Sequence, residues 1–391
     1  MSATAISRSP DLTRLVNEGY EVSIEHGHLL VSGIPYVTST GTVERGTLVS
    51  TLNLAGDVTH RPSDHVAYFA ASEMPCDENG ARLTKVIHDE TARDLAPGLP
   101  IVCGFSSKPP EPDPDYFEKM HRYAEIISGP ALRIDPSATP RTFKIVESDD
   151  AESIFLYADS ASGRAGIGDI SSRVRGHRVG IVGLGGTGAH VLDHVAKTPV
   201  EVDLFDGDTF LQHNAFRSPG AADVETLRER LAKVDYFARM YGGMRRGIRT
   251  HAEFIDESNV HELSPLDFVF VCVDDGPSKR VVVDFLVERG IPFVDVGMAL
   301  WRNDQAVGGQ VRTTYWSSER TEGLRDLSFA ADTPEDVYTA NIQISELNAL
   351  NAAHAVIRWK QHCGIYADFA SNTTAVYAID SNSLVSDEDA A

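Results

Sequence analysis

Cysteine is scarce in this chain, and its few cysteines stand far apart. None of them belongs to a Cys-x-x-Cys pair. This spacing excludes a zinc site built from two such pairs, and it excludes a dithiol redox motif. Isolated thiols without a pairing framework are typical of a protein from a reducing compartment. The four cysteines among the 391 residues are Cys76, Cys103, Cys272 and Cys363.

Long apolar runs are absent as well. Residues 1–18 contain neither the apolar core nor the cleavage site of a secretory signal. Nowhere does the chain have 18 consecutive apolar residues, the length that a membrane-spanning helix needs. We therefore expect a cytoplasmic protein with no membrane partner.

Positive charge is the third shortage. The chain has 35 Lys and Arg against 57 Asp and Glu, which gives a formal net charge of −22. A protein that binds extended nucleic acid needs a cationic surface to displace counterions from phosphate. The charge balance therefore excludes nucleic acid as an expected partner and also opposes binding to an anionic membrane. A small anionic ligand would depend on a few local cations and backbone N–H groups.

The length and an apolar fraction of 42% allow two or three domains. In residues 1–150, short apolar runs are separated by turn residues such as Gly33, Pro35 and Gly41, which predicts a β-rich α+β domain with one helix over 115–127. A polar, acidic stretch and a Gly/Ser-rich segment follow. We place the boundary there, between a domain of residues 1–150 and a second domain of residues 151–391.

From Arg178 onward, apolar strands alternate with helical stretches. Strands of this kind are typical of a mainly parallel sheet that is covered by helices on both faces. The second domain is therefore predicted to be a doubly wound, Rossmann-like α/β domain. The expected strands are 178–182, 200–205, 266–273 and 292–296, and the expected long helices are 187–197 and 342–361.

A glycine loop follows the first of these strands and opens a helix. Gly183, Gly185 and Gly188 satisfy the G-x-G-x-x-G pattern, which brings backbone N–H groups and a helix N-terminus against a phosphate. Asp206 stands 23 residues after Gly183 and suits a ribose hydroxyl. Taken alone, these features favour a nicotinamide- or flavin-dependent oxidoreductase.

The polar residues downstream favour nucleotidyl transfer instead. A dehydrogenase binds a pyrophosphate of constant charge and does not need an Asn, an Arg and a Lys beside it. Attack of a carboxylate on the α-phosphorus of ATP builds charge on the bridging oxygen, which Arg, Lys and Mg²⁺ stabilise. Asp274, at the carboxyl end of a strand, is a suitable Mg²⁺ ligand. The polar residues in question are Asp206, Asp208, Asn214, Arg217, Lys233, Asp274 and Asp275.

These residues carry a resemblance. The segment 178–309 resembles the ThiF/MoeB family, the adenylating domain of ubiquitin-activating enzymes. That family has G-x-G-G-x-G, then an Asp-x-Asp eight residues before an Asn and eleven before an Arg, a downstream Lys, and a Cys-x-Asp. Asn214 and Arg217 fall at these offsets from Asp206, and Lys233 matches after a short insertion. The remaining matches are Gly183, Gly185, Gly186 and Gly188, Cys272-Val-Asp274, and Gly308-Gly309-Gln310.

The resemblance implies an enzyme that uses ATP and Mg²⁺ to adenylate the C-terminal glycine carboxylate of a ubiquitin-like protein. It implies that the glycine loop and Asp206 hold the nucleotide, with Asp206 on the ribose. By the same resemblance, Asn214, Arg217 and Lys233 contact the phosphates and Asp274 holds magnesium. Asp208 and Asp275 are also expected to bind the nucleotide. The alternatives are that Asp208 only caps its loop and that Asp275 only ends its strand. A solvated helix face, with Arg230 as the competing cation, is the alternative for Lys233.

Dimeric members of that family use an arginine upstream of the glycine loop to reach the ATP of the partner subunit. The resemblance therefore implies a homodimer, with Arg164 as the candidate. Arg173 and Arg175 are alternatives.

Two departures from the family concern cysteine. No Cys-x-x-Cys pair follows the nucleotide domain, so no structural zinc is expected. No cysteine lies between Gln310 and Asn341, where many relatives carry a nucleophilic thiol. Cys363 follows later, at a predicted helix end, and Cys272 is expected to be a small buried hydrophobe. Whether a thioester forms stays open.

The sequence thus predicts an adenylyltransferase that activates the carboxylate of a ubiquitin-like protein or peptide. Two alternatives remain. One is an NAD(P)- or FAD-dependent oxidoreductase, and the other is a non-catalytic scaffold that binds a ubiquitin-like protein. The identity of the acyl substrate and the role of residues 1–150 are not coded by any motif.

Overall fold

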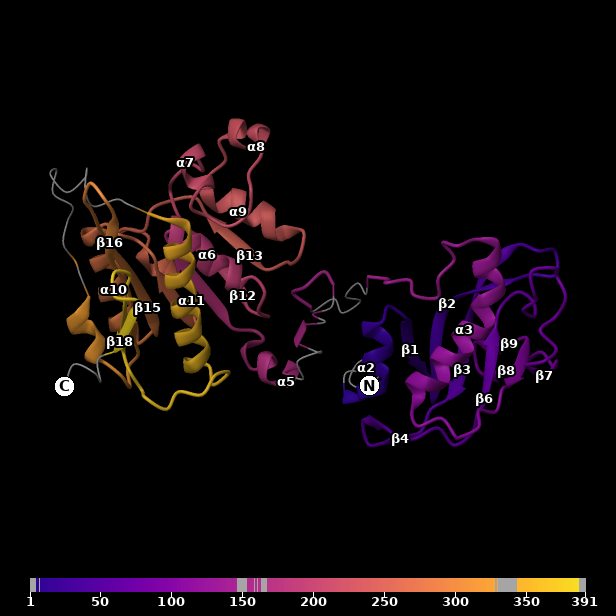
Figure 1. Ribbon diagram of the computed structural model, residues 1–391. Helices are drawn as coiled ribbons and strands as arrows, with labels where there is room; N and C mark the ends of the chain where they lie inside the picture. The colour runs from indigo at the N-terminus through magenta and orange to yellow at the C-terminus, as the bar shows by residue number, and fades with distance from the viewer. Residues whose placement is uncertain are drawn as a thin grey trace. The chain divides into compact units, whose positions relative to one another are not determined.

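The computed structural model describes residues 5, 6, 8–145, 153–157, 159, 161, 162, 167–327, 329 and 343–386. The chain divides into two compact units (Figure 1). The first comprises Met1–Val146 and Ser160–Gly166, and the second comprises Glu147–Asp159 and Ile167–Ala391. In the described residues, no helix is both long and apolar enough to cross a membrane.

The first unit is built on an antiparallel sheet of six strands in the order β1-β2-β3-β6-β10-β7. Helix α3 packs on this sheet over a buried apolar cluster, so the predicted β-rich α+β architecture is confirmed. The elements are α2 (Pro10–Asn17), β1 (Glu21–Glu25), β2 (His28–Val37), β3 (Val43–Thr51), β4 (Leu54–Ala55), β5 (Val58–Thr59), β6 (Val66–Ala70), β7 (Ile87–Asp89), β8 (Arg93–Ala96), β9 (Leu99–Ile101), β10 (Cys103–Ser106) and α3 (Tyr116–Ile134).

Helix α3 begins as expected and ends later than expected. The carboxylate of Asp115 accepts a hydrogen bond from the backbone N–H of Glu118 at 2.9 Å, which caps the first turn. The predicted end at residue 127 is wrong, because the helix continues through Pro130 to Ile134. Its buried apolar stripe extends into this last part through Ala131, and burial of that stripe offsets the hydrogen bond that proline removes.

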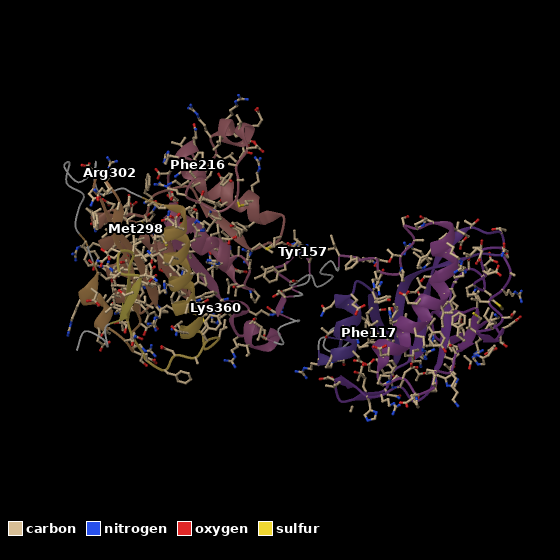
Figure 2. All side chains as sticks on the ribbon, viewed as in Figure 1. Phe117, Tyr157, Phe216, Met298, Arg302 and Lys360 are labelled. Carbon is tan, nitrogen blue, oxygen red and sulfur yellow. The ribbon has the colours of Figure 1, made fainter. Side chains whose placement is uncertain are left out.

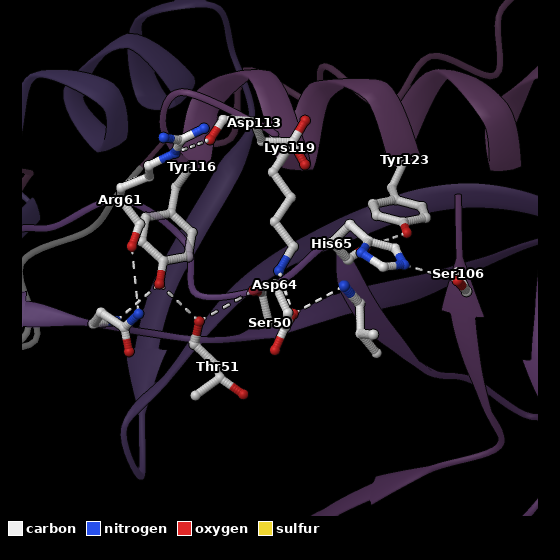
Figure 3. A network of polar contacts seen from close by, with 12 residues as sticks. Ser50, Thr51, Arg61, Asp64, His65, Ser106, Asp113, Tyr116, Lys119 and Tyr123 are labelled. Atoms are coloured by element: carbon white, nitrogen blue, oxygen red, sulfur yellow. Dashed lines mark hydrogen bonds and ion pairs between the residues drawn. The ribbon is translucent and has the colours of Figure 1, made fainter. Parts of the chain in front are cut away.

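Polar side chains of α3 attach the helix to the end of β3 and to the loop before β6 (Figure 3). The hydroxyl of Tyr116 donates to the carbonyl of Thr51 at 2.9 Å. The hydroxyl of Tyr123 donates to the carbonyl of His65 at 2.5 Å. Between them, the ammonium group of Lys119 lies 3.3 Å from Asp64, and burial lowers the pKa of this lysine. This network therefore fixes the position of α3 on the sheet.

The second unit contains an eight-stranded sheet in the order β13-β12-β11-β14-β15-β16-β17-β18. The pairs from β13 to β15 are parallel, and those from β15 to β18 are antiparallel. The chain order reverses between β11 and β14, as in doubly wound folds. The predicted Rossmann-like domain is confirmed. The strands are β11 (Arg178–Val182), β12 (Glu201–Phe205), β13 (Ile248–His251), β14 (Phe268–Val271), β15 (Phe293–Arg302), β16 (Val307–Trp316), β17 (Thr374–Ala378) and β18 (Ser383–Ser386).

Helices cover both faces of this sheet. On one face, α6 and α11 share a core in which Trp359 is fully buried. On the other face, α10 packs through Val282, Val283 and Leu286. The helical elements are α5 (Gly168–Ser171), η1 (Ser172–Val174), α6 (Gly186–Val195), α7 (Gln212–Ala215), α8 (Val224–Glu229), α9 (Lys233–Gly242), η2 (Val260–Leu263), α10 (Gly276–Arg289), η3 (Glu322–Asp326) and α11 (Ser345–His362).

Candidate active site

A cavity of about 640 Å³ opens at the carboxyl ends of β11, β12 and β14. This is the switch point of the sheet, where ligands bind in doubly wound folds. Most of the residues expected from the sequence line it. They are Gly183, Gly185, Gly186, Asp206, Asp208, Arg217, Lys233, Asp274 and Asp275.

Three predicted residues do not line the described cavity. Gly188 packs beneath the loop, and Arg164 lies outside the described residues. Asn214 is buried, and its amide oxygen accepts a hydrogen bond from the backbone N–H of Leu211 at 2.9 Å. Its observed contact is thus internal to the first turn of α7, and a phosphate contact stays a prediction.

The glycines of the loop are required for two different reasons. Gly183 has a φ of +91°, and a Cβ there would lie 2.8 Å from the carbonyl oxygen of Cys272. A Cβ at Gly188 would lie 1.9 Å from the carbonyl oxygen of Gly183, so α6 can approach β11 only without a side chain. Gly185, which precedes α6, has no atom within 4 Å of its Cβ direction. The loop therefore leaves the N-terminus of α6 open to an anion.

Asp206 and Lys233 form the wall beside the loop. The Oδ2 atom of Asp206 accepts a 2.6 Å hydrogen bond from the backbone N–H of Leu184, and Oδ1 accepts one from the backbone N–H of Asp208 at 2.8 Å. The ammonium group of Lys233 lies 3.4 Å from Asp206 and 2.6 Å from Asp208. Only 5% of Lys233 is exposed, so the alternative of a solvated helix face for this lysine is wrong. Arg230, its competitor, does not line the cavity.

Arg217 provides the second cation. Burial lowers the pKa of its guanidinium group, and the carboxylates of Asp274 and Asp208 oppose that shift. Its buried Nε atom has no hydrogen-bond partner among the described residues, and no carboxylate lies within ion-pair distance of the group. A half-buried cation without a partner for its buried Nε atom is costly unless an anion is bound. Arg217 therefore points to an anionic ligand in this cavity.

Asp274 and Asp275 follow β14 and differ in what they contact. The carboxylate of Asp275 accepts the backbone N–H of Ser278 at 2.9 Å and caps α10, which lowers the pKa of Asp275. Asp274 is exposed and has no hydrogen bond or ion pair to another described residue. Carboxylate oxygens beside a phosphate site suit Mg²⁺, which keeps several waters and takes one or two carboxylates. The donor set thus fits magnesium, with Asp274 the carboxylate left free to bind it.

Two groups of cavity residues were not predicted from the sequence. Asn348 and Asn351 project from α11. Asn348 accepts a hydrogen bond from Thr187 at 2.9 Å, and Asn351 donates one to the carbonyl of Gly297 at 3.0 Å. The second group is a charge cluster: Lys279 and Arg312 line the cavity, and both pair with the fully buried Asp295. The signal available in the sequence was that Asp295, Asn348 and Asn351 each interrupt a largely apolar strand or helix.

The cysteines lack the features of activated thiols. Burial raises the pKa of both Cys103 and Cys363 to about 12. It also raises the pKa of Cys76 and of Cys272, which is partly buried. Catalytic thiols have lowered pKa values instead. None of the four thiols therefore has the lowered pKa that is typical of an activated cysteine.

Comparisons with known proteins assign most of the chain. Residues 163–377 match the ThiF family, and residues 10–160 match a domain of unknown function, DUF6791. No curated protein matches the chain.

Several solved structures are similar to this chain. E. coli MccB with MccA-N7isoASN is 19% identical with a TM-score of 0.46, and the match covers 56% of this chain and 66% of that one. E. coli MccB with ATP is 18% identical, with a TM-score of 0.43 and coverages of 56% and 65%. PaaA is 14% identical, with a TM-score of 0.47 and coverages of 75% and 94%. The chain thus spans slightly less than two thirds of the length of these MccB chains. Because the ThiF match takes in more than half of the 391 residues, the chain belongs to the ThiF family.

Proposed function

We propose that this protein is an ATP- and Mg²⁺-dependent adenylyltransferase, which activates the C-terminal carboxylate of a ubiquitin-like protein or peptide as an acyl-adenylate. One observation carries the proposal. The guanidinium group of Arg217 has no ion pair among the described residues, although it lines a cavity between the glycine loop and Asp274. A triphosphate supplies the missing anion. Membership of the ThiF family supports the same chemistry.

Each residue then has a chemical task. An oxygen of the substrate carboxylate attacks the α-phosphorus of ATP, the bond from that phosphorus to the bridging oxygen breaks, and pyrophosphate leaves. Arg217 and Lys233 stabilise the negative charge that grows on the leaving oxygens. The N–H groups at the start of α6 hold phosphate, and Asp206 holds the ribose. Asp274 would bind Mg²⁺, which neutralises phosphate charge when it is bound.

Further parts of the proposal concern the assembly. We propose a cytoplasmic homodimer in which an arginine before β11 reaches the nucleotide of the partner subunit, with Arg164 as the candidate. The guanidinium group of Arg173 is hydrogen-bonded to the carbonyl of Gly364, which disfavours that alternative, whereas Arg175 is exposed. We propose that residues 1–150 and residues 151–391 are the two functional domains. We also propose that Asp208, Asn214 and Asp275 bind the nucleotide.

The decisive experiment is ATP–pyrophosphate exchange with small proteins that end in Gly-Gly, beginning with those encoded beside this gene. Exchange that depends on one such protein is the expected result. Arg217→Ala and Asp274→Ala should each abolish it, because each removes charge stabilisation at the phosphates. Arg228→Ala is the matched control, since its arginine is exposed on α8 and pairs with Glu225. Exchange that is unchanged in both site variants would remove the mechanism.

The same assay separates the alternatives. An oxidoreductase would transfer hydride to or from a nicotinamide or flavin without consuming ATP. A scaffold would bind the ubiquitin-like protein equally well after Arg217→Ala and release no pyrophosphate. Neither alternative requires an arginine without an ion pair in this cavity.

A further inference from the structure

One group of metal-ligand side chains lies beside the nucleotide cavity and has no part in the proposed chemistry. His251 is the last residue of β13, Glu253 follows it, and Glu262 belongs to η2. The ligand atoms of these three side chains lie within 4.8 Å of one another. Two atoms bound to one tetrahedral Zn²⁺ ion are about 3.4 Å apart, so the three side chains are close enough to share an ion.

The group lies at one end of the row of parallel strands. β13 is the outer strand of that row, and Glu253 lines the cavity (Figure 1). Met298, labelled in Figure 2, lines the same cavity from β15, at the other end of the row. Asp274, the candidate magnesium ligand, follows β14, and both β11 and β12 lie between β14 and β13. The group is therefore distinct from the expected magnesium site.

A buried carboxylate fixes the proton on one nitrogen of His251. The Nε2 atom of His251 lies 3.1 Å from Oδ1 of Asp203, which is fully buried. Burial raises the pKa of Asp203, but hydrogen bonds from Arg178 and His251 keep that pKa below the ordinary value, so Asp203 is ionised and can only accept. The proton of the neutral imidazole is therefore on Nε2, and the lone pair is on Nδ1.

This lone pair faces a second carboxylate. The Nδ1 atom of His251 lies 2.8 Å from an oxygen of Glu262. Two acceptor atoms at this distance repel each other unless a positive charge lies between them. A proton or a metal ion can supply that charge, and the third member of the group distinguishes between the two.

Glu253 favours a metal ion. A proton on Nδ1 would satisfy Glu262 alone, whereas an ion can bind both glutamates and the imidazole together. Among the described residues, neither glutamate forms an ion pair with a lysine or an arginine. With a neutral imidazole, the three ligands carry two negative charges, which a divalent ion offsets.

The surroundings hold the imidazole as a ligand. Its ring stacks on Phe205, with the ring centroids 4.2 Å apart and an angle of 18° between the planes. Arg178 fixes the carboxylate of Asp203 through two hydrogen bonds of 2.7 Å. A carboxylate on the far nitrogen of a histidine is the usual support of a metal-bound imidazole.

We propose that His251, Glu253 and Glu262 bind a divalent transition-metal ion, with Zn²⁺ as the ion that suits one imidazole and two carboxylates. Water completes the coordination. Mg²⁺ prefers oxygen ligands alone, so the two ions select different sites. The zinc ion would join Glu253 to η2 and so hold the next residue, Phe254, which lines the nucleotide cavity.

The test measures Zn²⁺ binding by the full chain after dialysis against EDTA. Equilibrium dialysis with Zn²⁺ alone should show about one tightly bound ion per chain, with a Kd of about 1 µM or lower. Nitrogen NMR of protein with labelled histidines should show a zinc-dependent shift at Nδ1 of His251, while Nε2 keeps its proton. The signal of His251 is assigned from its loss in His251→Gln.

Variants identify the ligands. Glu253→Gln and Glu262→Gln should each weaken Zn²⁺ binding about tenfold or more, because an amide is a poorer ligand than a carboxylate. Both side chains reach the surface, so both variants should fold. Glu257→Gln is the matched control, since its carboxylate is exposed in the same loop and lies outside the group. Asp274→Ala should also bind Zn²⁺ normally, because Asp274 belongs to the expected magnesium site.

Two results would overturn the proposal. One is Zn²⁺ binding that is equally strong in the wild type, Glu253→Gln and Glu262→Gln. The other is an Nδ1 signal of His251 that Zn²⁺ leaves unchanged, which would mean that a proton alone lies between His251 and Glu262. Because the assay contains neither ATP nor a peptide, its result is independent of pyrophosphate exchange and of the proposed function.

Discussion

The ammonium group of Lys233 lies 2.6 Å from the carboxylate of Asp208, and although the lysine is buried, the aspartate is exposed. A phosphate that enters the cavity therefore meets a lysine already held in place. Lys233→Met should weaken ATP binding about tenfold or more, the cost of losing a charge-assisted hydrogen bond. Arg230→Met is the matched control and should bind ATP normally. Calorimetric titration measures both, and equal affinities would return Lys233 to the role of a structural ion-pair partner.

The contact between Gly186 and α11 predicts a rescue. A Cβ at Gly186 would lie 2.1 Å from the amide nitrogen of Asn348. Gly186→Ala should therefore destabilise the second unit by about 1–3 kcal/mol, the usual cost of overpacking. Combining it with Asn348→Ala opens the space and should recover at least half of that loss. Urea unfolding measures the stability of each variant.

Gly188→Ala is the contrasting case. Its Cβ would meet the carbonyl oxygen of Gly183, which is backbone and cannot be trimmed. Asn348→Ala should give Gly188→Ala no recovery. If Asn348→Ala restored the stability of both glycine variants equally, the clash with the Asn348 side chain would not be the cause of the loss in Gly186→Ala.

Acid should destabilise the second unit through Asp203. Burial raises the pKa of this carboxyl group. Hydrogen bonds from Arg178 and His251 lower it by a larger amount, so the pKa of Asp203 lies below the ordinary 3.8. A carboxyl group with a depressed pKa stabilises the fold above its unfolded pKa and loses that contribution as the pH falls through the folded value. The free energy of unfolding should thus decrease as the pH drops below about 4.

Tryptophan fluorescence isolates this effect, because all three tryptophans, Trp301, Trp316 and Trp359, belong to the second unit. Asp203→Asn should be less stable at neutral pH and show a shallower decrease in acid. An identical slope in wild type and variant would assign the acid sensitivity to other carboxylates.

Thiol reagents should not stop the proposed reaction. Burial raises the pKa of Cys363 to about 12, so almost none of this thiol is ionised at neutral pH. Cys363→Ser and iodoacetamide treatment should each leave pyrophosphate exchange within about twofold of the untreated protein. A thioester-linked intermediate on Cys363, trapped by mass spectrometry, would contradict this prediction.

The parts of the site that are close in sequence could be predicted. The loop Gly183–Gly188 lies between β11 and α6, and the offsets from Asp206 to Arg217 span the loop and short helix that follow β12, so in each case local spacing fixes the geometry. The cluster of Lys279, Asp295 and Arg312 could not be found in this way. Its members come from α10, β15 and β16, and only the register of the hairpin brings Arg312 beside Asp295.

Element lengths failed where tertiary packing outweighed the local pattern. The expected strand 292–296 ends before Gly297, whereas β15 continues to Arg302 because β16 pairs with it along its whole length. In the first unit, the expected helix 115–127 is too short, because the sheet beneath α3 provides the apolar partner that keeps the helix intact beyond Pro130.

The two asparagines of α11 tie this helix to both walls of the cavity. Asn348 bonds Thr187 and donates to the carbonyl of Arg217 at 3.4 Å, while Asn351 holds both Gly297 and Thr313. One rigid helix therefore sets the spacing between the groups that would grip the triphosphate and the strand that borders the other wall. A change at the far, buried end of α11, such as Trp359→Phe, would alter the gap across which two reactants must meet.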